Sequence, residues 1–310
     1  MQKYRYTPIV TILWYFCAMQ LLDGKVASAA LREKLKKEVA GHVALGKRPP
    51  HLVAILVGND GASETYVASK IRNCNETGFK SSLIRFPADV EEQTLVDAIL
   101  HHNNHPETDG ILVQLPLPAQ LNTHRIIVTI SPDKDVDGFH PVNAGKMMLG
   151  EGGFVSATPL GIMHLLQYYN IETSGKHAVV IGRSNIVGRP MSVLLSANAN
   201  PGNCTVTLTH SRTKDLPSFT RNADIIVAAL GIPAFLKKDM VKPGAVVMDV
   251  GITRIPDATK KTGFRLQGDV DFDAVAPLCS YITPVPGGVG LMTIGALLQN
   301  TYQAYLNHIA

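Results

Sequence analysis

Tyr66 and Lys70 stand four positions apart within Ser63–Cys74, a stretch that the sequence predicts to be a helix. Their side chains therefore share one face of that helix. A lysine beside an aromatic ring in a partly dry pocket can lose its proton near neutral pH, because burial disfavours the ammonium form. The neutral amine would then serve as a base or a proton relay. An ordinary Tyr/Lys pair on a helix surface is the alternative without chemistry.

Further polar groups accompany another predicted strand and the loop after it. Gln114 interrupts the apolar strand predicted over Gly110–Leu115, and a buried amide needs partners or a ligand. The loop Lys134–Gly138 carries two carboxylates, Asp135 and Asp137. A core glutamine with satisfied hydrogen bonds, and carboxylates that form a turn or cap a helix, are the alternatives.

A turn from Gly182 to Gly188, GRSNIVG, joins a predicted strand to a predicted helix. At such a place the backbone N–H groups at the start of the helix can bind the pyrophosphate of a dinucleotide. Ser184 replaces the middle glycine of the usual GxGxxG pattern, so the pattern alone is weak, and a tight turn without a ligand is the alternative. Three more strand-like segments follow in the rhythm of a Rossmann fold, which favours the dinucleotide.

The end of the next strand, Cys204–His210, indicates which nicotinamide cofactor is used. Enzymes that use NAD place Asp or Glu there to hold the ribose hydroxyls. This chain has the hydroxyl of Ser211 and the guanidinium of Arg212, with no carboxylate until Asp215. Arg183 adds a second guanidinium from the glycine turn. These groups suit a 2′-phosphate, so the sequence predicts NADP.

The stretch Pro284–Gly290, PVPGGVG, has too little side chain to belong to a core. Its backbone at Pro286, Gly287 and Gly288 is of the kind that lies against a flat ligand. A stiff linker is the alternative. All of these features fall at strand ends or helix starts, where α/β enzymes gather their sites.

Two kinds of element must position these residues, because short apolar runs typical of buried strands alternate with stretches of helical spacing. The predicted strands are His51–Gly58, Ser81–Phe86, Gly110–Leu115, His177–Gly182, Cys204–His210, Ile225–Leu230 and Ala245–Val250. The predicted helices are Ala27–Val43, Ser63–Cys74, Glu91–His102, Leu160–Tyr169, Met191–Asn198 and Met292–Tyr305. A polar loop is expected over Ser131–Asn143. The fold class is therefore α/β with parallel sheets, and a second unit begins near Thr158–Gly161.

The composition excludes several classes of protein. Of the 310 residues, 45% are hydrophobic and 17% are charged, which is too apolar for a disordered chain. Lys and Arg number 29 against 25 Asp and Glu, without a basic stripe, so no nucleic-acid partner is expected. The four cysteines are far apart, as in an intracellular protein with reduced thiols, and the histidines form no HxxxH pair supported by Glu. No protein-held metal is expected.

The first eighteen residues differ from the rest. Basic residues precede an apolar run, Ile9–Met19, as in a signal peptide. The run is shorter than the roughly 20 residues of a membrane span, and no small-residue cleavage site follows directly. We expect translation to begin at Met19, with residues 1–18 as an extension outside the fold and no membrane association. Trp14 is the only tryptophan, so tryptophan fluorescence from the native protein would refute this start.

Taken together, nine stretches identify a family. They are MQLLDGK from Met19, VGNDGASETYVASK from Val57, GILVQLPLP from Gly110, PDKDVDGFHPVNAG from Pro132, IGRSNIVGRP from Ile181, ADIIVAALG from Ala223, MDVGI from Met248, GDVDF from Gly268 and TPVPGGVGLMT from Thr283. From Met19 to about Tyr302 the chain resembles the bifunctional methylenetetrahydrofolate dehydrogenase/methenyltetrahydrofolate cyclohydrolase family.

The resemblance implies a homodimeric, cytoplasmic enzyme of one-carbon metabolism. It would oxidise 5,10-methylenetetrahydrofolate to 5,10-methenyltetrahydrofolate with NADP and then hydrolyse that cation to 10-formyltetrahydrofolate. The expected lobes are a folate-binding catalytic domain, residues 19–157 plus 287–310, and a Rossmann domain for NADP, residues 158–286. The reaction would take place in the cleft between them.

The resemblance also implies a role for individual residues. Lys70 would be the main catalytic residue, with Tyr66 stacked on the folate, Gln114 touching Lys70, and Asp137 holding the pterin ring. The residues expected around NADP are Gly182, Arg183, Ser184, Gly188, Ser211 and Ile252. Those expected to contact the folate are Tyr66, Gln114, Asp137, Pro286, Gly287 and Gly288.

Two positions depart from the family pattern. Ser156-Ala157 stands where the family often has Pro-Cys, and Leu291 replaces the proline that usually follows PGGVG. Neither removes a group that the chemistry needs, but both lie where they could alter loop geometry between the lobes.

Three other functions compete with this interpretation. The YxxxK pattern is also typical of short-chain dehydrogenases, but there the glycine loop comes first, whereas Tyr66 precedes Gly182 here. A dehydrogenase without the cyclohydrolase step is the second alternative. A nucleotide-sensing Rossmann protein is the third, and it would bind NADP without acting on methylenetetrahydrofolate.

Overall fold

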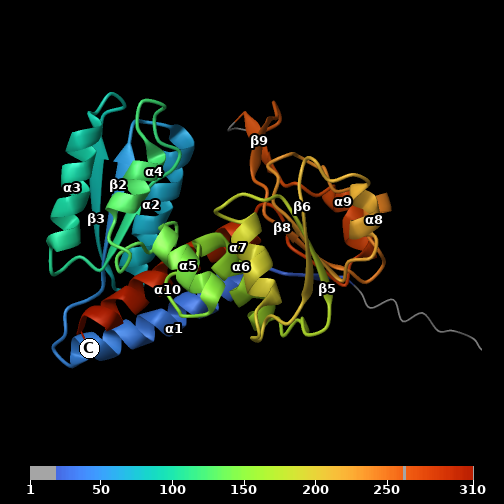
Figure 1. The fold of residues 1–310 in the computed structure, drawn as a ribbon, viewed down its shortest axis with the longest axis horizontal. Coiled ribbons are helices and arrows are strands. Elements are labelled where there is room, and N and C mark those ends of the chain that lie inside the picture. Colours follow the sequence, from blue (N-terminus) through green and yellow to red (C-terminus); the bar gives the residue numbers. More distant parts are fainter. Residues whose placement is uncertain (1–18, 261–262, 310) are drawn as a thin grey trace, which may run out of the picture.

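The computed structural model describes residues 19–260 and 263–309. They form two α/β lobes that lie side by side (Figure 1). Two long helices, α1 (Gly24–Ala44) and α10 (Val289–Ile309), pack against each other beneath the first lobe. The prediction about residues 1–18 lies outside the described part of the chain.

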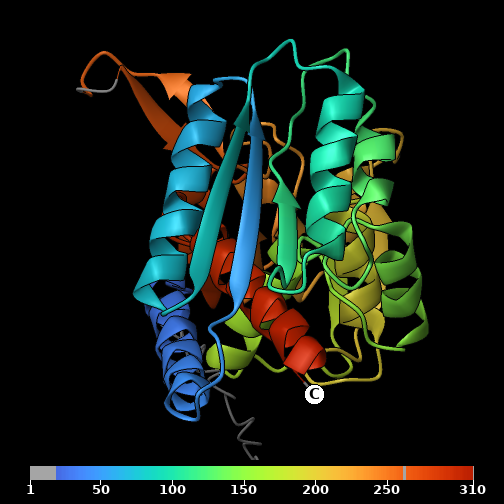
Figure 2. The ribbon, with the colours of Figure 1, turned by 90° about the vertical axis from the view of Figure 1, so that its left-hand side faces the viewer.

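A three-stranded parallel sheet of order β3-β2-β4 forms the centre of the first lobe. Every residue of the middle strand, β2, is buried, because helices cover both faces of the sheet. Alternate residues of β2 join two apolar clusters, one with α1, α2 and α10 and the other with α3 and α4. Figure 2 shows α10 crossing behind the three strands. The elements are β2 (His51–Val57), α2 (Gly61–Glu76), β3 (Lys80–Phe86), α3 (Glu92–Asn104), β4 (Gly110–Val113) and α4 (Thr123–Thr129).

The second lobe has a six-stranded parallel sheet of order β1-β11-β8-β7-β5-β6. Its strands are β1 (Gln20–Leu21), β5 (His177–Ile181), β6 (Thr205–Thr209), β7 (Ile225–Ala228), β8 (Val246–Asp249) and β11 (Tyr281–Ile282). From β5 the chain goes first to β6 on one side and then to β7 on the other. Open parallel sheets bind ligands beyond the carboxyl ends of the strands at such a reversal.

The remaining elements surround the second sheet or connect the lobes. They are α5 (Pro141–Leu149), α6 (Ala157–Tyr168), α7 (Gly188–Ser196), α8 (Leu216–Thr220), the 3₁₀ helix η1 (Lys238–Met240), the antiparallel hairpin β9 (Thr253–Pro256) and β10 (Phe264–Gln267), α9 (Phe272–Val275) and the 3₁₀ helix η2 (Ala276–Leu278). The helix α6 packs along α10, which joins the lobes. Within the described residues, no helix is both long and apolar enough to span a bilayer.

The structure confirms the α/β class and all seven predicted strands, with small shifts of their ends. The prediction that Gln114 interrupts a strand is wrong, because β4 ends at Val113. The loop predicted over Ser131–Asn143 contains the start of α5. The division into lobes at residue 157 stays a prediction, and β1 pairs with β11 in the second sheet although it precedes the first lobe in sequence.

Candidate active site

Lys70 lies on α2 with its side chain turned into the protein. The helix starts after Asp60, whose carboxylate accepts a hydrogen bond from the Ser63 N–H at 2.8 Å. Lys70 is only 5% exposed, and its Nζ lies 5.1 Å from the centre of the Tyr66 ring. Burial lowers the pKa of this amine, although the nearby Asp137 carboxylate acts in the opposite direction. Desolvation therefore favours the neutral form.

Gln114 holds the Lys70 amine. The Lys70 Nζ donates a hydrogen bond to the Gln114 Oε1 at 3.1 Å. The other end of the amide is tied down, because its Nε2 donates to the Leu115 carbonyl at 2.7 Å. That bond fixes which atom of the amide faces the amine. Gln114 is thus a half-buried group with a defined orientation, which suits a residue that positions Lys70.

The two loop carboxylates have different surroundings. Asp135 accepts hydrogen bonds from the Phe139 and His140 N–H groups and from the Asn143 amide, at 3.2, 2.8 and 2.9 Å. It therefore shapes the turn before α5, and burial raises its pKa to about 6. Asp137 instead lines a cavity together with Lys70. Burial raises the pKa of Asp137, and the Lys70 charge opposes that rise.

A cavity of about 170 Å³ brings the predicted polar residues together. Its walls come from both lobes, and they comprise Tyr66, Lys70, Gln114, Leu115, Asp137, Phe139, Ser156, Ala157, Thr158, Ile186 and Thr293. The Tyr66 hydroxyl hydrogen-bonds to the Thr293 side chain, and the Thr158 and Thr293 hydroxyl oxygens are 3.1 Å apart. Sequence reasoning missed Thr293, although it ends the quoted stretch TPVPGGVGLMT.

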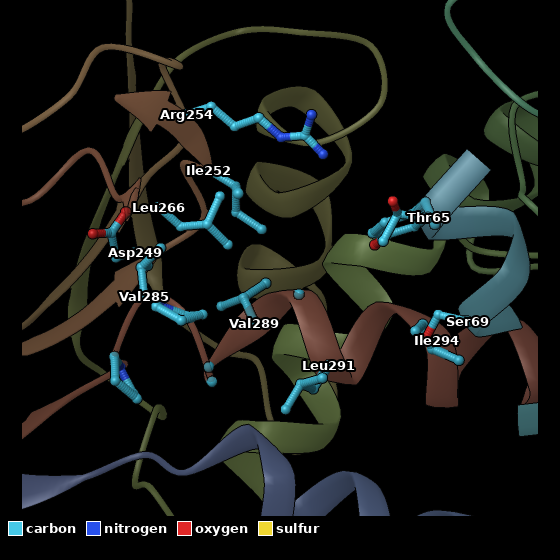
Figure 3. A pocket seen from close by; sticks show the side chains of 16 residues that line it. Thr65, Ser69, Asp249, Ile252, Arg254, Leu266, Val285, Val289, Leu291 and Ile294 are labelled. Carbon is cyan, nitrogen blue, oxygen red and sulfur yellow. The ribbon is translucent and has the colours of Figure 1, made fainter. Parts of the chain in front are cut away.

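A larger cavity of about 390 Å³ continues from Tyr66 (Figure 3). Residues 284–291, including Pro286, Gly287 and Gly288, form much of its wall. In Figure 3, Arg254 reaches over the cavity from β9, opposite Thr65 on α2. The two cavities share Tyr66 and form one crevice with a polar end and an apolar end. Arg254 is a second residue that sequence reasoning missed, since no motif marks it.

The glycine turn lies beyond the carboxyl end of β5. A Cβ atom on Gly188 would lie 1.9 Å from the Gly182 carbonyl oxygen, so only glycine allows the helix to start this close to the strand. Gly182 itself has φ +114°, a value that disfavours other residues. The Ser184 Oγ accepts hydrogen bonds from the Val187 and Gly188 N–H groups at 3.2 and 3.4 Å. Ser184 thereby orders the turn in which it replaces a glycine.

The predicted NADP residues follow the carboxyl ends of three strands of the second sheet, β5, β6 and β8. β5 and β6 are parallel neighbours, with Ile181 opposite Thr209, so Arg183 and Ser211 emerge from adjacent strand ends. Both are exposed. Ile252 lies apart from them in sequence and lines the larger cavity, where it is 50% exposed.

Two buried aspartates anchor the hairpin that carries Arg254. The Asp249 carboxylate accepts hydrogen bonds from the N–H groups of Gly251, Asp269 and Val270 at 3.2, 2.8 and 3.0 Å. The Asp269 Oδ2 accepts from the N–H groups of Leu230 and Gly231 at 2.6 and 3.0 Å. Burial raises the pKa of Asp249 to about 7. Asp249 belongs to the stretch MDVGI and Asp269 to GDVDF, so both stretches support the wall of the crevice.

The junction between the lobes contains both departures from the family pattern. The Ser156 Oγ donates to the Ile186 carbonyl at 2.6 Å, which ties the start of α6 to the glycine turn. Leu291 is 37% exposed on the first turn of α10 and lines the larger cavity. Among the residues that the structure describes, no group of three or more His, Cys, Asp or Glu side chains is arranged to hold a metal ion.

Comparison with family models gives two matches that together cover most of the chain. Residues 22–137 match the model described as "Tetrahydrofolate dehydrogenase/cyclohydrolase, catalytic domain". Residues 156–309 match "Tetrahydrofolate dehydrogenase/cyclohydrolase, NAD(P)-binding domain".

Similar proteins and structures agree with these matches. A relative named "Bifunctional protein FolD", from Phocaeicola vulgatus, is 58% identical over 286 residues, which is 92% of this chain and 98% of the relative. The bifunctional FolD dehydrogenase/cyclohydrolase structure from Campylobacter jejuni is 47% identical with a TM-score of 0.87, over 94% of this chain and 99% of the other. The Trypanosoma brucei dehydrogenase-cyclohydrolase, complexed with NADP and an inhibitor, is 36% identical with a TM-score of 0.88, over 94% and 98%.

Proposed function

This chain belongs to the tetrahydrofolate dehydrogenase/cyclohydrolase family, and from that premise we propose that the crevice between its lobes carries both reactions. The enzyme oxidises 5,10-methylenetetrahydrofolate to 5,10-methenyltetrahydrofolate with NADP and then hydrolyses the product to 10-formyltetrahydrofolate. The observation that carries the proposal is the buried Lys70 amine, held 3.1 Å from Gln114 in a cavity with walls from both lobes.

The second lobe fits NADP at the carboxyl edge of its sheet. The close approach of Gly188 to Gly182 brings the start of α7 next to the end of β5, and the start of a helix at such a place is where a pyrophosphate binds. The end of β6 offers Ser211 and Arg212 and lacks a carboxylate, which suits a 2′-phosphate. When bound, NADP supplies the hydride acceptor. We propose that the residues around it are Gly182, Arg183, Ser184, Gly188, Ser211 and Ile252.

We propose that the folate lies along the crevice with its pterin ring at the polar end. Tyr66 offers a ring face at the junction of the two cavities, and stacking there would align the ring system. The Asp137 carboxylate matches the donor edge of the pterin, where two hydrogen bonds give orientation as well as affinity. Pro286, Gly287 and Gly288 would contact the folate along the larger cavity.

Lys70 then has a defined task in both steps. Loss of hydride leaves a delocalised cation on the substrate, and a neutral amine does not repel it as an ammonium would. In the hydrolysis, water adds to the one-carbon unit and gives up a proton to the Lys70 amine. The same amine delivers that proton to the folate nitrogen whose bond to the carbon breaks, and the remaining hydroxyl proton leaves to solvent as the formyl C=O forms. Gln114 keeps the amine in place throughout.

Burial, rather than any neighbouring charge, favours the neutral form of the Lys70 amine. Cys74 lies one helical turn from Lys70, and burial raises the pKa of its thiol to about 12, so it carries no charge that would hold a proton on the amine. The Asp137 carboxylate, which lines the same cavity, raises the pKa of Lys70 and so opposes the effect of burial. Its pairing with the donor edge of the pterin would weaken this opposing effect when the substrate binds.

An ultraviolet time course with methylenetetrahydrofolate and NADP tests the function. We expect NADPH to appear together with a rise and then a decay of the methenyl absorbance. NADPH formation without decay of the methenyl signal would contradict the second activity. Binding of NADP without any change in absorbance would identify a nucleotide sensor instead.

We also propose that the enzyme is a homodimer in the cytoplasm, as the family resemblance implies. The dimer is tested by light scattering at several protein concentrations, where a mass near twice that of one chain is expected. Cell fractionation tests the location, and recovery of the activity in the membrane or periplasmic fraction would contradict it.

A further inference from the structure

Asn300 lies on α10, and nothing in the reactions described above uses it. It is 5% exposed, and its amide nitrogen makes two hydrogen bonds to distant parts of the chain. The Asn300 Nδ2 donates to the Val136 carbonyl at 2.8 Å and to the Val155 carbonyl at 2.9 Å. An amide nitrogen carries two hydrogens, and here both are used. Because both partners are carbonyl oxygens, they fix which way the amide points.

The first of these bonds acts on the backbone of Asp137. The Val136 carbonyl belongs to the same peptide unit as the Asp137 nitrogen, and a peptide unit is planar. The Val136 side chain is fully buried in the apolar core of the first lobe. Beyond Asp137, the Asp135 carboxylate holds the next part of the turn by accepting hydrogen bonds from two backbone N–H groups. Asn300 therefore holds the peptide unit that leads directly into Asp137.

The second bond acts at the junction between the lobes. The Val155 carbonyl belongs to the peptide unit that leads into Ser156, whose Oγ donates to the Ile186 carbonyl of the glycine turn at 2.6 Å. The two segments that Asn300 joins are in close contact, because a Cβ atom on Gly138 would lie 2.5 Å from the Val155 carbonyl carbon. The amide of Asn300 thus fastens the aspartate turn to the junction.

The helix α10 also meets the candidate site at a second point. Thr293 and Asn300 are seven positions apart, or about two helical turns, so they share one face of the helix. The Thr293 side chain hydrogen-bonds to the Tyr66 hydroxyl. One helix, which crosses behind the three-stranded sheet (Figure 2), therefore supports both Tyr66 and the turn that carries Asp137.

We propose that Asn300 is a positioning residue, which acts through Asp137 and sets where that carboxylate meets the pterin. This inference rests on the proposed placement of the folate. Asn300 is not among the residues that line the cavity, so it acts without touching the substrate. Loss of its amide would take a donor from two backbone carbonyls, and buried carbonyls need partners. The turn would shift to find other donors, and Asp137 would move with it.

Initial rates of Asn300→Ala with methylenetetrahydrofolate and NADP, measured well below its Tm, test the proposal. We expect the folate KM to rise by about tenfold, because a displacement of about 1 Å costs up to about 100-fold. The kcat should change little, since Lys70 and Gln114 hold each other without Asn300. An unchanged folate KM, or a lower kcat at an unchanged KM, would overturn the proposal.

A double-mutant cycle with Asp137→Asn separates positioning from a general effect on the fold. If Asn300 acts through Asp137, the two substitutions disturb the same interaction with the substrate. Asn300→Ala should then raise the folate KM by less than about twofold when Asp137→Asn is already present. The same tenfold rise in both backgrounds would show that the two residues act independently, and it would contradict the proposal.

Thr301 offers a matched control. It is fully buried and follows Asn300 on the same helix, but its Oγ1 donates to the Leu297 carbonyl within α10 at 2.8 Å. Thr301→Val also removes a buried donor, so Tm should fall, whereas the folate KM should stay at the wild-type value. An equal rise in KM for Thr301→Val would show that any disturbance of α10 weakens folate binding, which would overturn the specific role of Asn300.

A second variant covers the case in which Asn300→Ala does not fold. Asn300→Ser keeps one hydrogen-bond donor and should give a smaller rise in the folate KM. No rise, or a rise that persists in full with Asp137→Asn, would overturn the proposal.

The experiment also separates this inference from the proposed function. If the proposed function is wrong, wild-type enzyme will not oxidise methylenetetrahydrofolate at all. If only the inference is wrong, wild-type enzyme will turn over normally, and the Asn300 variants will keep its KM or lose affinity independently of Asp137.

Discussion

The two lobes build their parts of the proposed site from different parts of the chain. The first lobe contributes long side chains, with Lys70 and Gln114 joined at 3.1 Å and Asp137 in the same cavity. At its glycine turn the second lobe contributes backbone, because Gly182 and Gly188 bring strand and helix so close that a Cβ atom would lie 1.9 Å from a carbonyl oxygen.

The two arrangements are disabled by opposite kinds of substitution. A wall built from side chains is disabled by truncating one group, and the backbone around it survives. A wall built from backbone is disabled by adding an atom, while many side-chain changes leave it intact. Substitutions of both kinds test that contrast.

Truncation at Lys70 should have the largest effect. We expect Lys70→Met to lower the cyclohydrolase rate by about 10³-fold, within the range for loss of a general acid–base group. NADP affinity, measured by titration of fluorescence or heat, should stay unchanged because the glycine turn is intact. Lys36→Met is a matched control at an exposed position. Normal hydrolysis by Lys70→Met would contradict the assignment.

Addition of a methyl group at Gly188 should disable the glycine turn of the second lobe. The Cβ of Gly188→Ala would collide with the Gly182 carbonyl, and overpacking costs about 1–3 kcal/mol, so NADP affinity should fall by up to about 100-fold. Gly145→Ala is the control, because its new Cβ meets nothing within 4 Å. It places alanine inside the helix α5, and alanine favours a helix more than glycine does, so Tm should rise slightly. Equal NADP affinity in both variants would show that the turn does not bind NADP.

The two loop aspartates should separate binding from folding. Asp137→Asn should raise the folate KM by about thirtyfold, since a hydrogen bond to a charged group contributes about 1.5–3 kcal/mol, with little change in Tm. Asp135→Asn should lower Tm, because the Asp135 carboxylate accepts hydrogen bonds from two backbone N–H groups and an amide. Thermal denaturation curves measure Tm, and initial rates measure the folate KM, for each variant. A lowered Tm for Asp137→Asn together with a raised folate KM for Asp135→Asn would contradict this assignment of roles.

A substitution at Ser211, just after the end of β6, should have the smallest effect. Ser211→Asp introduces the carboxylate that NAD enzymes carry at this strand end. We expect the preference for NADP over NAD, as the ratio of kcat/KM values, to fall about tenfold, because the new charge repels a 2′-phosphate. Unchanged preference would mean that the phosphate lies away from the end of β6.

Much of the fold could be predicted because burial leaves a pattern in the sequence. A strand such as β2, covered on both faces, is a continuous apolar run. The strands β1 and β11 have two residues each, too few to show any period, and their pairing joins opposite ends of the chain. The hairpin β9–β10 was also missed, because its short, half-exposed strands alternate too briefly.

The candidate site could be predicted only in part. Tyr66 and Lys70 can be recognised because their spacing places both on one face of a predicted helix. Gln114 can be recognised because it is a polar residue within an apolar run. Thr293 and Arg254 do not, because each reaches the crevice only through tertiary packing, Thr293 on the returning helix α10 and Arg254 on a hairpin anchored by buried aspartates. Spacing along the chain carries no information about such contacts.

The protonation state of Lys70 is the centre of this account. It can be measured by NMR titration of the lysine Nζ atoms in ¹⁵N-labelled protein, with Lys70→Met used to assign the resonance. Because burial lowers the pKa of this amine, it should lose its proton at a lower pH than a lysine ordinarily does. The cyclohydrolase rate should fall as the pH drops through the same value. Titration of Lys70 together with the exposed lysines, or a rate that ignores its protonation, would contradict the account.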